Sequence, residues 1–234
     1  MVYAGPTGSD RSAPTCLTSI RRSNLHRQRG GGIVRLVSFR RNAVFEGHDW
    51  YNPPAEWSVE GGVLRFTTLA ETDFWNNTHY GFRHGNGHVF ARPVAGDFSA
   101  EAVFSAEYVA LYDQAGVMLR VDDDNWLKTG IEFTDGLAHF SVVVTRADQS
   151  DWSVIPLPAE AMAEMQVRLT RHGDALRVQY RFGDRSWAMA RLAFLDMPES
   201  VAVGPAACSP IGAGLTVQFQ RFAIGPAISR DLHD

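Results

Sequence analysis

The 234-residue sequence is poor in cysteine and has no long apolar segment. Its two cysteines, Cys16 and Cys208, are too few for a disulfide framework, so we expect a reducing compartment and a cytoplasmic protein. No apolar run approaches the roughly 18 residues that a membrane-spanning helix needs, and the N-terminus lacks the apolar stretch of a secretory signal. We therefore expect no membrane partner.

Charge is distributed unevenly along the chain. Residues 1–43 contain eight arginines and a single acid, Asp10, so they carry +7 and leave −11 on the rest. An acidic body argues against nucleic acid as a partner. Because residues 1–43 show neither alternation nor helical periodicity, we expect a disordered Arg-rich extension there, and a short C-terminal tail at residues 229–234.

Deletion of residues 1–43 is accordingly expected to leave the folding transition almost unchanged. A segment without apolar patterning has little to contribute to a packed core. The melting temperatures of the full chain and of a chain starting at Val44 should coincide in thermal denaturation. A large fall on truncation would contradict this expectation.

The remaining residues alternate between apolar and polar in short runs separated by turn residues, which is typical of β-strands. Only residues 158–165 suggest a helix, of about two turns. Hairpin-spaced strands with almost no helix predict an all-β sandwich or barrel. The expected strands lie near residues 63–67, 98–105, 116–121, 126–133, 139–145, 167–169, 176–182, 187–189 and 215–224.

Three successive strands carry an unusual polar face. Glycine inside a strand often marks close approach by a ligand or by another backbone. Tryptophan offers an apolar plate suited to stacking on a sugar ring. We therefore expect these strands to form one side of a ligand pocket, which Gln114, Trp126, Lys128 and Glu132 line. The full face contains Gln114, Gly116, Met118 and Arg120, then Trp126, Lys128, Gly130 and Glu132, then His139, Ser141 and Thr145.

Lys128 is the single lysine beside 21 arginines. A compact ammonium is not equivalent to a planar guanidinium, so its retention favours a role in holding a ligand oxygen or a carboxylate. Glu132 or Asp113 is the expected anionic partner, since a buried ammonium needs one. The alternative is an exposed lysine retained by chance.

Two loop segments add candidate ligand-binding residues. Trp75, His79 and Tyr80 lie in a stretch dense in aromatic and amide groups, which suits either a sugar-binding wall or a cover for the edge of the core. Asp151 and Trp152 place another acid beside another tryptophan. Asp113 is a further candidate, although aspartate at such a position is commonly a turn or cap residue.

Standard metal and nucleophile motifs are missing, so we expect no metal and no cofactor. His79, His84 and His88 match no zinc spacing. Residues 122–125 are acidic but lack the glycine and distal glutamate of an EF-hand loop. The sequence contains no G-x-S-x-G motif and no phosphate-binding glycine loop that opens a helix.

Several motifs stand out together along the body of the chain. They are Trp50, Trp57, TDFW at 72–75, YGF at 80–82, DQAGVM at 113–118, WLKTGIE at 126–132 and SDWS at 150–153. Together they resemble a bacterial and fungal domain family of the concanavalin A-like lectin/glucanase superfamily, whose fungal members include proteins named for regulation of enolase. The resemblance covers residues 44–228 and implies a two-sheet antiparallel jelly-roll sandwich with a concave face, but no particular reaction.

These features favour a non-catalytic, lectin-like domain that binds a carbohydrate or another small molecule on its concave face. One alternative is a glycoside hydrolase, which needs two carboxyl groups across the scissile bond. The E-x-D-x-x-E motif common in hydrolases of this superfamily is absent, so Glu132 would have to pair with Asp113 or Asp151 from another strand. The second alternative is a regulatory domain of carbohydrate metabolism that uses the same face for a protein partner.

Overall fold

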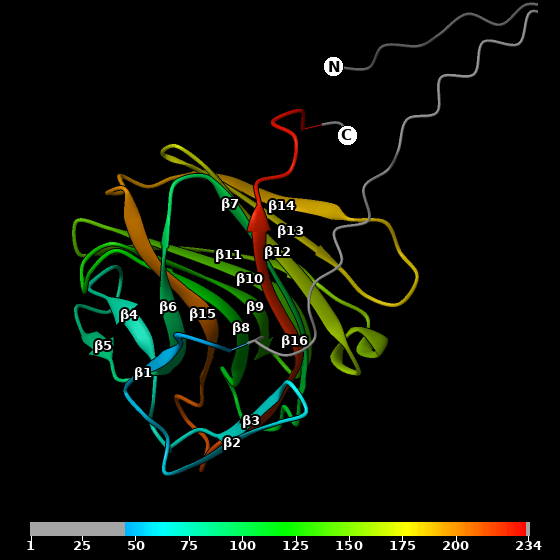
Figure 1. Ribbon diagram of the computed structural model, residues 1–234. Coiled ribbons are helices and arrows are strands. Elements are labelled where there is room, and N and C mark those ends of the chain that lie inside the picture. Colours follow the sequence, from blue (N-terminus) through cyan, green and yellow to red (C-terminus); the bar gives the residue numbers. More distant parts are fainter. Residues whose placement is uncertain (1–44, 233–234) are drawn as a thin grey trace, which may run out of the picture. The chain divides into compact units, whose positions relative to one another are not determined.

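The computed structural model describes residues 45–232, which form two seven-stranded antiparallel sheets and one separate hairpin (Figure 1). The all-β sandwich expected from the sequence is confirmed. The expectations for residues 1–43 concern a segment outside the described residues. The first sheet has the order β1 (Asp49–Tyr51), β6 (His88–Ala95), β15 (Ser200–Cys208), β8 (Gln114–Arg120), β9 (Trp126–Thr134), β10 (Leu137–Arg146) and β11 (Gln149–Pro156).

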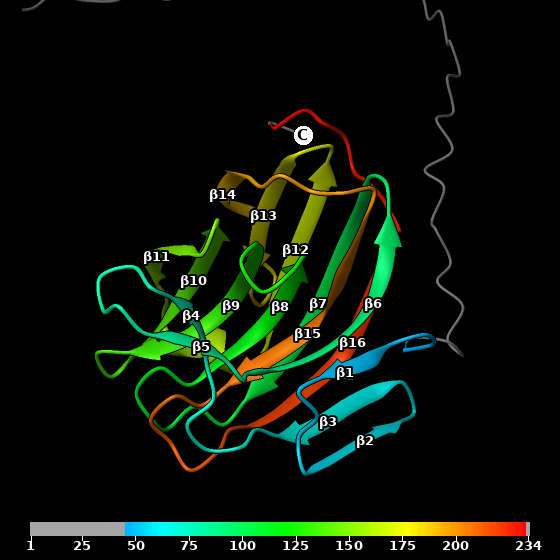
Figure 2. The ribbon, with the colours of Figure 1, turned by 90° about the vertical axis from the view of Figure 1, so that its left-hand side faces the viewer.

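The second sheet packs behind the first and closes the sandwich (Figure 2). Strands β4 (Phe74–Asn76) and β5 (Arg83–Gly85) pair only with each other and belong to neither large sheet. The order of the second sheet is β14 (Ala188–Phe194), β13 (Ala175–Arg181), β12 (Met165–His172), β7 (Phe98–Ala106), β16 (Thr216–Pro226), β3 (Val63–Thr67) and β2 (Glu56–Glu60).

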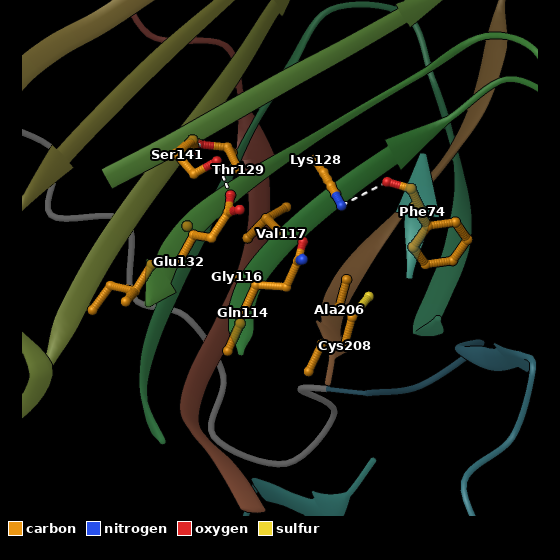
Figure 3. Close-up of a pocket in the computed structure, with 14 residues that line it drawn as sticks. Phe74, Gln114, Gly116, Val117, Lys128, Thr129, Glu132, Ser141, Ala206 and Cys208 are labelled. Atoms are coloured by element: carbon orange, nitrogen blue, oxygen red, sulfur yellow. Dashed lines mark hydrogen bonds between the residues drawn. The ribbon is translucent and has the colours of Figure 1, made fainter. Parts of the chain in front are cut away.

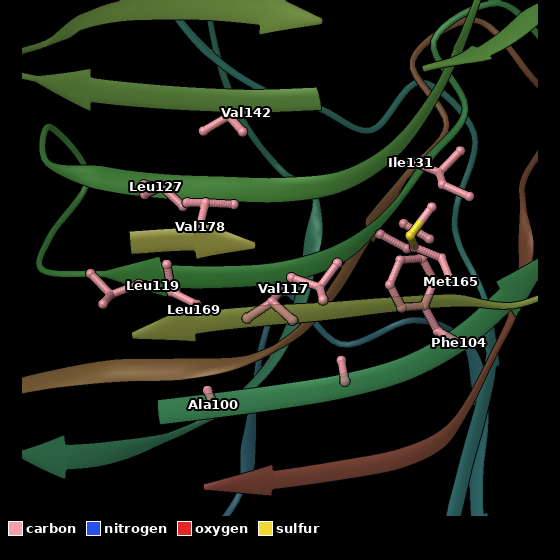
Figure 4. Packing of buried hydrophobic residues seen from close by; sticks show 14 of the residues in the cluster. Ala100, Phe104, Val117, Leu119, Leu127, Ile131, Val142, Met165, Leu169 and Val178 are labelled. Atoms are coloured by element: carbon pink, nitrogen blue, oxygen red, sulfur yellow. The ribbon is translucent and has the colours of Figure 1, made fainter. Parts of the chain in front are cut away.

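The core lies between the facing sides of the two sheets (Figure 4). In β7, Ala100 and Phe104 are buried on the inner side, as the alternation predicts, and Leu127 and Ile131 of β9 belong to the same cluster. Burial of each Leu, Ile or Phe side chain contributes about 1.5–3 kcal/mol. The inner faces of β8, β9 and β10 are thus committed to the core, which leaves their outer faces for other use.

The expected two-turn helix at residues 158–165 is wrong. The structure has a single 3₁₀ turn, η1 (Ala159–Met162), that follows Pro158. Met165, at the end of the expected helix, is instead a fully buried residue of β12, so packing in the second sheet ends the helical turn early. Among residues 45–232, no helix is long and apolar enough to cross a membrane.

Strand β15 escapes detection from sequence although it is central in the first sheet. It contains Pro205, and proline is normally confined to edge strands because it lacks a backbone N–H. The pairing of β15 with β6 is interrupted at Gly204 and Pro205, whereas its pairing with β8 continues through both. The sheet therefore accommodates the proline by leaving out one local stretch of pairing.

The β4–β5 hairpin lies over the outer face of the first sheet. The backbone N–H of Asn76 donates to Ser150 Oγ of β11 at 2.9 Å, and the Asn76 side chain donates to Asp148 at 2.8 Å. Beneath it, the Phe74 ring packs edge-on against Trp126, with 6.0 Å between ring centroids. One end of the outer face is thus covered, and the other end stays open.

Candidate functional site

The floor of the candidate site is the outer face of β8 and β9 (Figure 3). Gly116 and Gly130 face each other across the two strands. A Cβ atom added at Gly116 would lie 2.0 Å from the carbonyl oxygen of Thr129, and one at Gly130 would lie 2.0 Å from that of Ala115. The glycines therefore mark close approach of two backbones, and they leave a strip of floor without side chains.

Above this floor is a cleft of about 650 Å³. Strand register determines where its polar groups lie. Gln114 pairs with Glu132 on one side of the two glycines, and Met118 pairs with Lys128 on the other side. Its composition combines carboxyl, ammonium and amide groups with several aromatic rings. The lining residues are Glu71, Asp73, Trp75, Tyr80, Phe82, His84, Tyr112, Gln114, Lys128, Glu132, Val143, Trp152, Pro210 and Ile211.

Lys128 points into the site and is held by the segment that leads into β4. Its Nζ donates to Asp73 Oδ1 at 3.0 Å and to the carbonyl oxygen of Phe74 at 2.6 Å, and only 11% of the side chain is exposed. The expected carboxylate partner exists, but it is Asp73 rather than Glu132 or Asp113. Burial alone lowers the pKa of Lys128, but the negative charge of Asp73, with a smaller contribution from Glu132, raises it above its usual value. The ammonium therefore stays charged.

Glu132 is the most deeply buried acid of the cleft, at 6% exposure. Its Oε2 accepts hydrogen bonds from Ser141 Oγ at 2.6 Å and from Trp152 Nε1 at 3.2 Å. Burial raises the pKa of this carboxyl above its usual value, and the nearby ammonium of Lys128 and the Ser141 hydroxyl only partly oppose that effect. Glu132 is thus a carboxyl that two hydrogen bonds hold in place and that forms no ion pair among the described residues, although the charge of Lys128 is near enough to act on its pKa.

Aromatic side chains form the walls of the cleft. The Trp75 indole N–H donates to the carbonyl oxygen of Thr78 at 2.9 Å, which fixes the ring on the hairpin side. Tyr80 and Phe82 stack with 5.2 Å between centroids and remain 56% and 42% exposed. Trp152 of β11 also lines the cleft, and its indole N–H contacts Glu132 and Ser141. These rings offer flat apolar surfaces beside the polar floor.

Six of the residues singled out from the sequence come together in this cleft. They come from strands β4, β8, β9 and β11 and from the loop between β4 and β5. We propose them as ligand-binding residues. They are Trp75, Tyr80, Gln114, Lys128, Glu132 and Trp152.

Trp126 and His79 do not line the cleft, contrary to expectation. Trp126 is 1% exposed because the β4–β5 hairpin covers it, and it belongs to a small apolar cluster with Phe74 and Met118. His79 is an exposed residue with positive φ, and its ring contacts Tyr80 from outside the cleft. Alternation identifies the sheet face, but it contains no signal for the hairpin that covers Trp126.

Asp113 and Asp151 also lie elsewhere. The Asp113 carboxylate is 1% exposed and accepts from the backbone N–H groups of Val109 and Ala110 and from Ser209 Oγ, so it is the turn residue of the alternative interpretation. The Asp151 side chain lies on the opposite face of β11 from Trp152, and its Oδ2 accepts a hydrogen bond from the Arg191 guanidinium at 2.9 Å. Neither acid faces Glu132 across the cleft.

Sequence reasoning missed several lining residues. Asp73 was within a segment rich in aromatics but had no feature that separated it from a turn residue. Tyr112 precedes β8, and Pro210 and Ile211 follow β15, so only the folded chain brings them to the cleft. No periodic signal marks positions outside strands.

Metal ligands do not cluster in the described part of the chain. No group of three His, Cys, Asp or Glu side chains is arranged to hold a metal ion among residues 45–232. Cys208 lines the small hollow under Phe74, and burial raises the pKa of its thiol far above the usual range. It is therefore a neutral buried thiol rather than a nucleophile.

Comparison with known proteins agrees with these motifs. Residues 50–227 match the family described as "Protein of unknown function (DUF1349)". The chain belongs to this family. It is 36% identical over 199 residues to "Regulation of enolase protein 1" of Saccharomyces cerevisiae, covering 85% of this chain and 99% of the yeast protein. An uncharacterised protein of Emericella nidulans is 28% identical over 182 residues, covering 73% of this chain and 86% of that protein. The family resemblance predicted from the motifs is confirmed.

Solved structures give the same fold. A functionally unknown protein from Saccharomyces cerevisiae has a TM-score of 0.75 at 34% identity, covering 79% of this DUF1349 chain and 99% of the yeast one. The GH43 protein BlXynB from Bacillus licheniformis has a TM-score of 0.58 at 17% identity, covering 75% of this chain and 36% of that enzyme. The second likeness shows a shared β-sandwich fold alone, because one fold carries many functions.

Proposed function

We propose that this DUF1349 protein is a non-catalytic, lectin-like domain that binds a carbohydrate in the cleft over β8 and β9. The observation that carries the proposal is the pairing of exposed aromatic walls with a buried polar floor. A sugar ring has apolar faces and a rim of hydroxyl groups, so it needs both kinds of surface at once. Tyr80 and Trp152 supply the first kind, and Gln114, Lys128 and Glu132 supply the second.

The floor also keeps hydrogen-bonding capacity for a ligand. Among the described residues, no donor reaches Oε1 of Glu132, Oδ2 of Asp73 or Oε1 of Gln114. The other polar atom of each side chain is already hydrogen-bonded within the protein. Acceptors that remain open in a cleft favour a ligand bearing hydroxyl or amine donors. This pattern supports binding of a polyol more than binding of an apolar molecule.

Catalysis of glycoside hydrolysis is less well supported. The carboxyl pairs considered from the sequence, Glu132 with Asp113 or with Asp151, do not form across the cleft. Asp73 does line the cleft, but its Oδ1 is occupied by Lys128 and Gln114. We therefore favour binding over catalysis. A regulatory role would be consistent with the name of the yeast relative. We also propose a cytoplasmic location, because a free thiol such as Cys208 persists in a reducing compartment.

Tyr80→Ala is the direct test of the aromatic wall. A panel of neutral, amino and acidic monosaccharides and short oligosaccharides is first titrated into the full chain by calorimetry. For the sugars that bind, Tyr80→Ala should weaken affinity about tenfold, because one stacked ring contributes about 1.4 kcal/mol. The melting temperature should hardly change, since the side chain is largely exposed.

Phe194→Ala is the matched control, because Phe194 is 54% exposed and lies on the edge strand of the second sheet, away from the cleft. Its affinity for the same sugars should equal that of the wild type. Equal losses in both variants would point to a general effect of surface aromatics. Absence of binding by every sugar in the panel would refute the proposed function.

A further inference from the structure

The cleft carries more carboxyl groups than cations. Glu71, Asp73 and Glu132 line it, and Lys128 is its single Lys or Arg side chain. That ammonium is already engaged by Asp73 and by the carbonyl oxygen of Phe74. Within residues 45–232, no ion pair engages Glu71 or Glu132. The electrostatic balance of the site is therefore incomplete without a further positive charge.

Glu132 is the carboxyl group at which a positive partner would bind. One carboxylate oxygen is held by Ser141 and Trp152, which aligns the group, and the other is open toward the cleft. A buried carboxylate without a cation is costly, and removal of the cost requires either protonation or a positive partner. An ammonium group at hydrogen-bonding distance from the open oxygen would supply that partner through a charge-assisted bond.

The walls favour the same chemistry. Trp75, Tyr80, Phe82 and Trp152 present aromatic faces or edges around this floor. Aromatic faces attract cations, by about 0.5–1 kcal/mol at exposed sites and more where water is excluded. An anionic group would instead meet Glu71 and Glu132 and find Lys128 already paired with Asp73.

We propose that the cleft selects sugars that carry a protonated amine, of the hexosamine class, over neutral sugars and over acidic or phosphorylated ones. This inference rests on the proposed function and names its ligand class. Glu132 accepts the ligand ammonium, Lys128 and Gln114 hold ring hydroxyls, and the aromatic walls cover the ring faces.

The inference implies a pH dependence. Burial raises the pKa of Glu132 above its usual value, and only the ionised carboxyl can pair with an ammonium, so a proton and the ligand compete for this group. Affinity for the amine should therefore rise as the pH increases through the titration of Glu132 and fall below it. A neutral sugar should show no such trend. The titratable groups that face Glu132 are Lys128 on β9, His139 on β10, Cys208 on β15, Tyr112 before β8 and Asp73 before β4.

The test compares glucosamine with N-acetylglucosamine, glucose and glucuronate by calorimetric titration of the full chain at a pH where the amine is protonated. Glucosamine should bind at least about tenfold more tightly than its N-acetylated form, which keeps the ring but loses the charge. At a pH within the titration of Glu132, binding measured in two buffers of different ionisation enthalpy should reveal proton release for glucosamine alone.

Glu132→Gln keeps a hydrogen-bond acceptor for Ser141 but removes the charge. It should weaken the binding of glucosamine at least about tenfold more than that of glucose and remove the pH dependence. Glu60→Gln on β2, an exposed position outside the cleft, should change the affinity for neither sugar. Equal or tighter binding of the neutral or acidic sugars by the wild type would overturn the inference and leave the proposed function intact. Binding of none of the four would overturn both. Melting curves of both variants show whether they fold.

Discussion

Alanine at Gly130 is expected to prevent stable folding. Its Cβ atom would lie 2.0 Å from the carbonyl oxygen of Ala115 and 2.6 Å from Cα of Gly116, both of them backbone atoms that cannot rotate away. The two central strands would have to separate, with a loss of more than about 4 kcal/mol from a total of about 5–15 kcal/mol. Urea unfolding monitored by circular dichroism measures this loss, and Gly116→Ala should behave alike.

Gly85→Ala is the matched control. Gly85 also lies in a strand, but a Cβ atom there would meet nothing within 4 Å. The urea midpoint of this variant should equal that of the wild type. A Gly130→Ala protein that unfolds at the wild-type urea midpoint would contradict this prediction. It would show that β8 and β9 accommodate the added methyl group without loss of stability.

Asp113→Ala is expected to destabilise the protein strongly without changing the cleft. The carboxylate accepts from the N–H groups of Val109 and Ala110 at 3.0 and 2.8 Å and from Ser209 Oγ at 2.7 Å. Removal leaves these donors unpaired near the core, at a cost of about 3 kcal/mol. Thermal denaturation and urea titration measure the loss, and Asp113→Asn, which keeps one acceptor, should lose less.

Sugar affinity distinguishes the structural role of Asp113 from the binding role considered from the sequence. Folded Asp113→Ala protein should bind the same sugars with unchanged affinity, because the carboxylate points into the turn rather than the cleft. Asp196→Ala, at an exposed position with no hydrogen bond or ion pair shown among the described residues, serves as the control for stability. Loss of binding with unchanged stability would return Asp113 to the site.

The sandwich was predictable because alternation survives wherever one strand face is buried. Phe98 to Phe104 and Leu127 to Ile131 have the period of two that a core imposes. Strand β15 was not predictable, since Pro205 argues against a central strand and only the local break in pairing with β6 reconciles the two. The predicted helix at residues 158–165 is wrong because Met165 belongs to strand β12, so that only a 3₁₀ turn fits before it.

The site was predictable to the extent that strand register determines it. Gln114, Lys128 and Glu132 share a face of adjacent strands, and that follows from alternation alone. Asp151 could have been excluded on the same ground, because Trp152 takes the cleft side of β11. The burial of Trp126 and the pairing of Lys128 with Asp73 depend on contacts across about 50 residues of chain, for which local patterns contain no signal.

The β4–β5 hairpin has its own local stability, because its strands pair with neither large sheet. Side-chain contacts hold it instead, among them the Lys128–Asp73 ion pair, the ion pairs of Arg83 with Asp124 and Asp148, and the hydrogen bonds of Asn76 to Ser150 and Asp148. Amide hydrogens at such a position exchange through opening events that leave the sandwich intact, so they report a smaller free energy than those of β8 or β9. A ligand that contacts both Trp75 and Trp152 would join the hairpin to the sheet, and protection of its amides would increase with occupancy of the cleft.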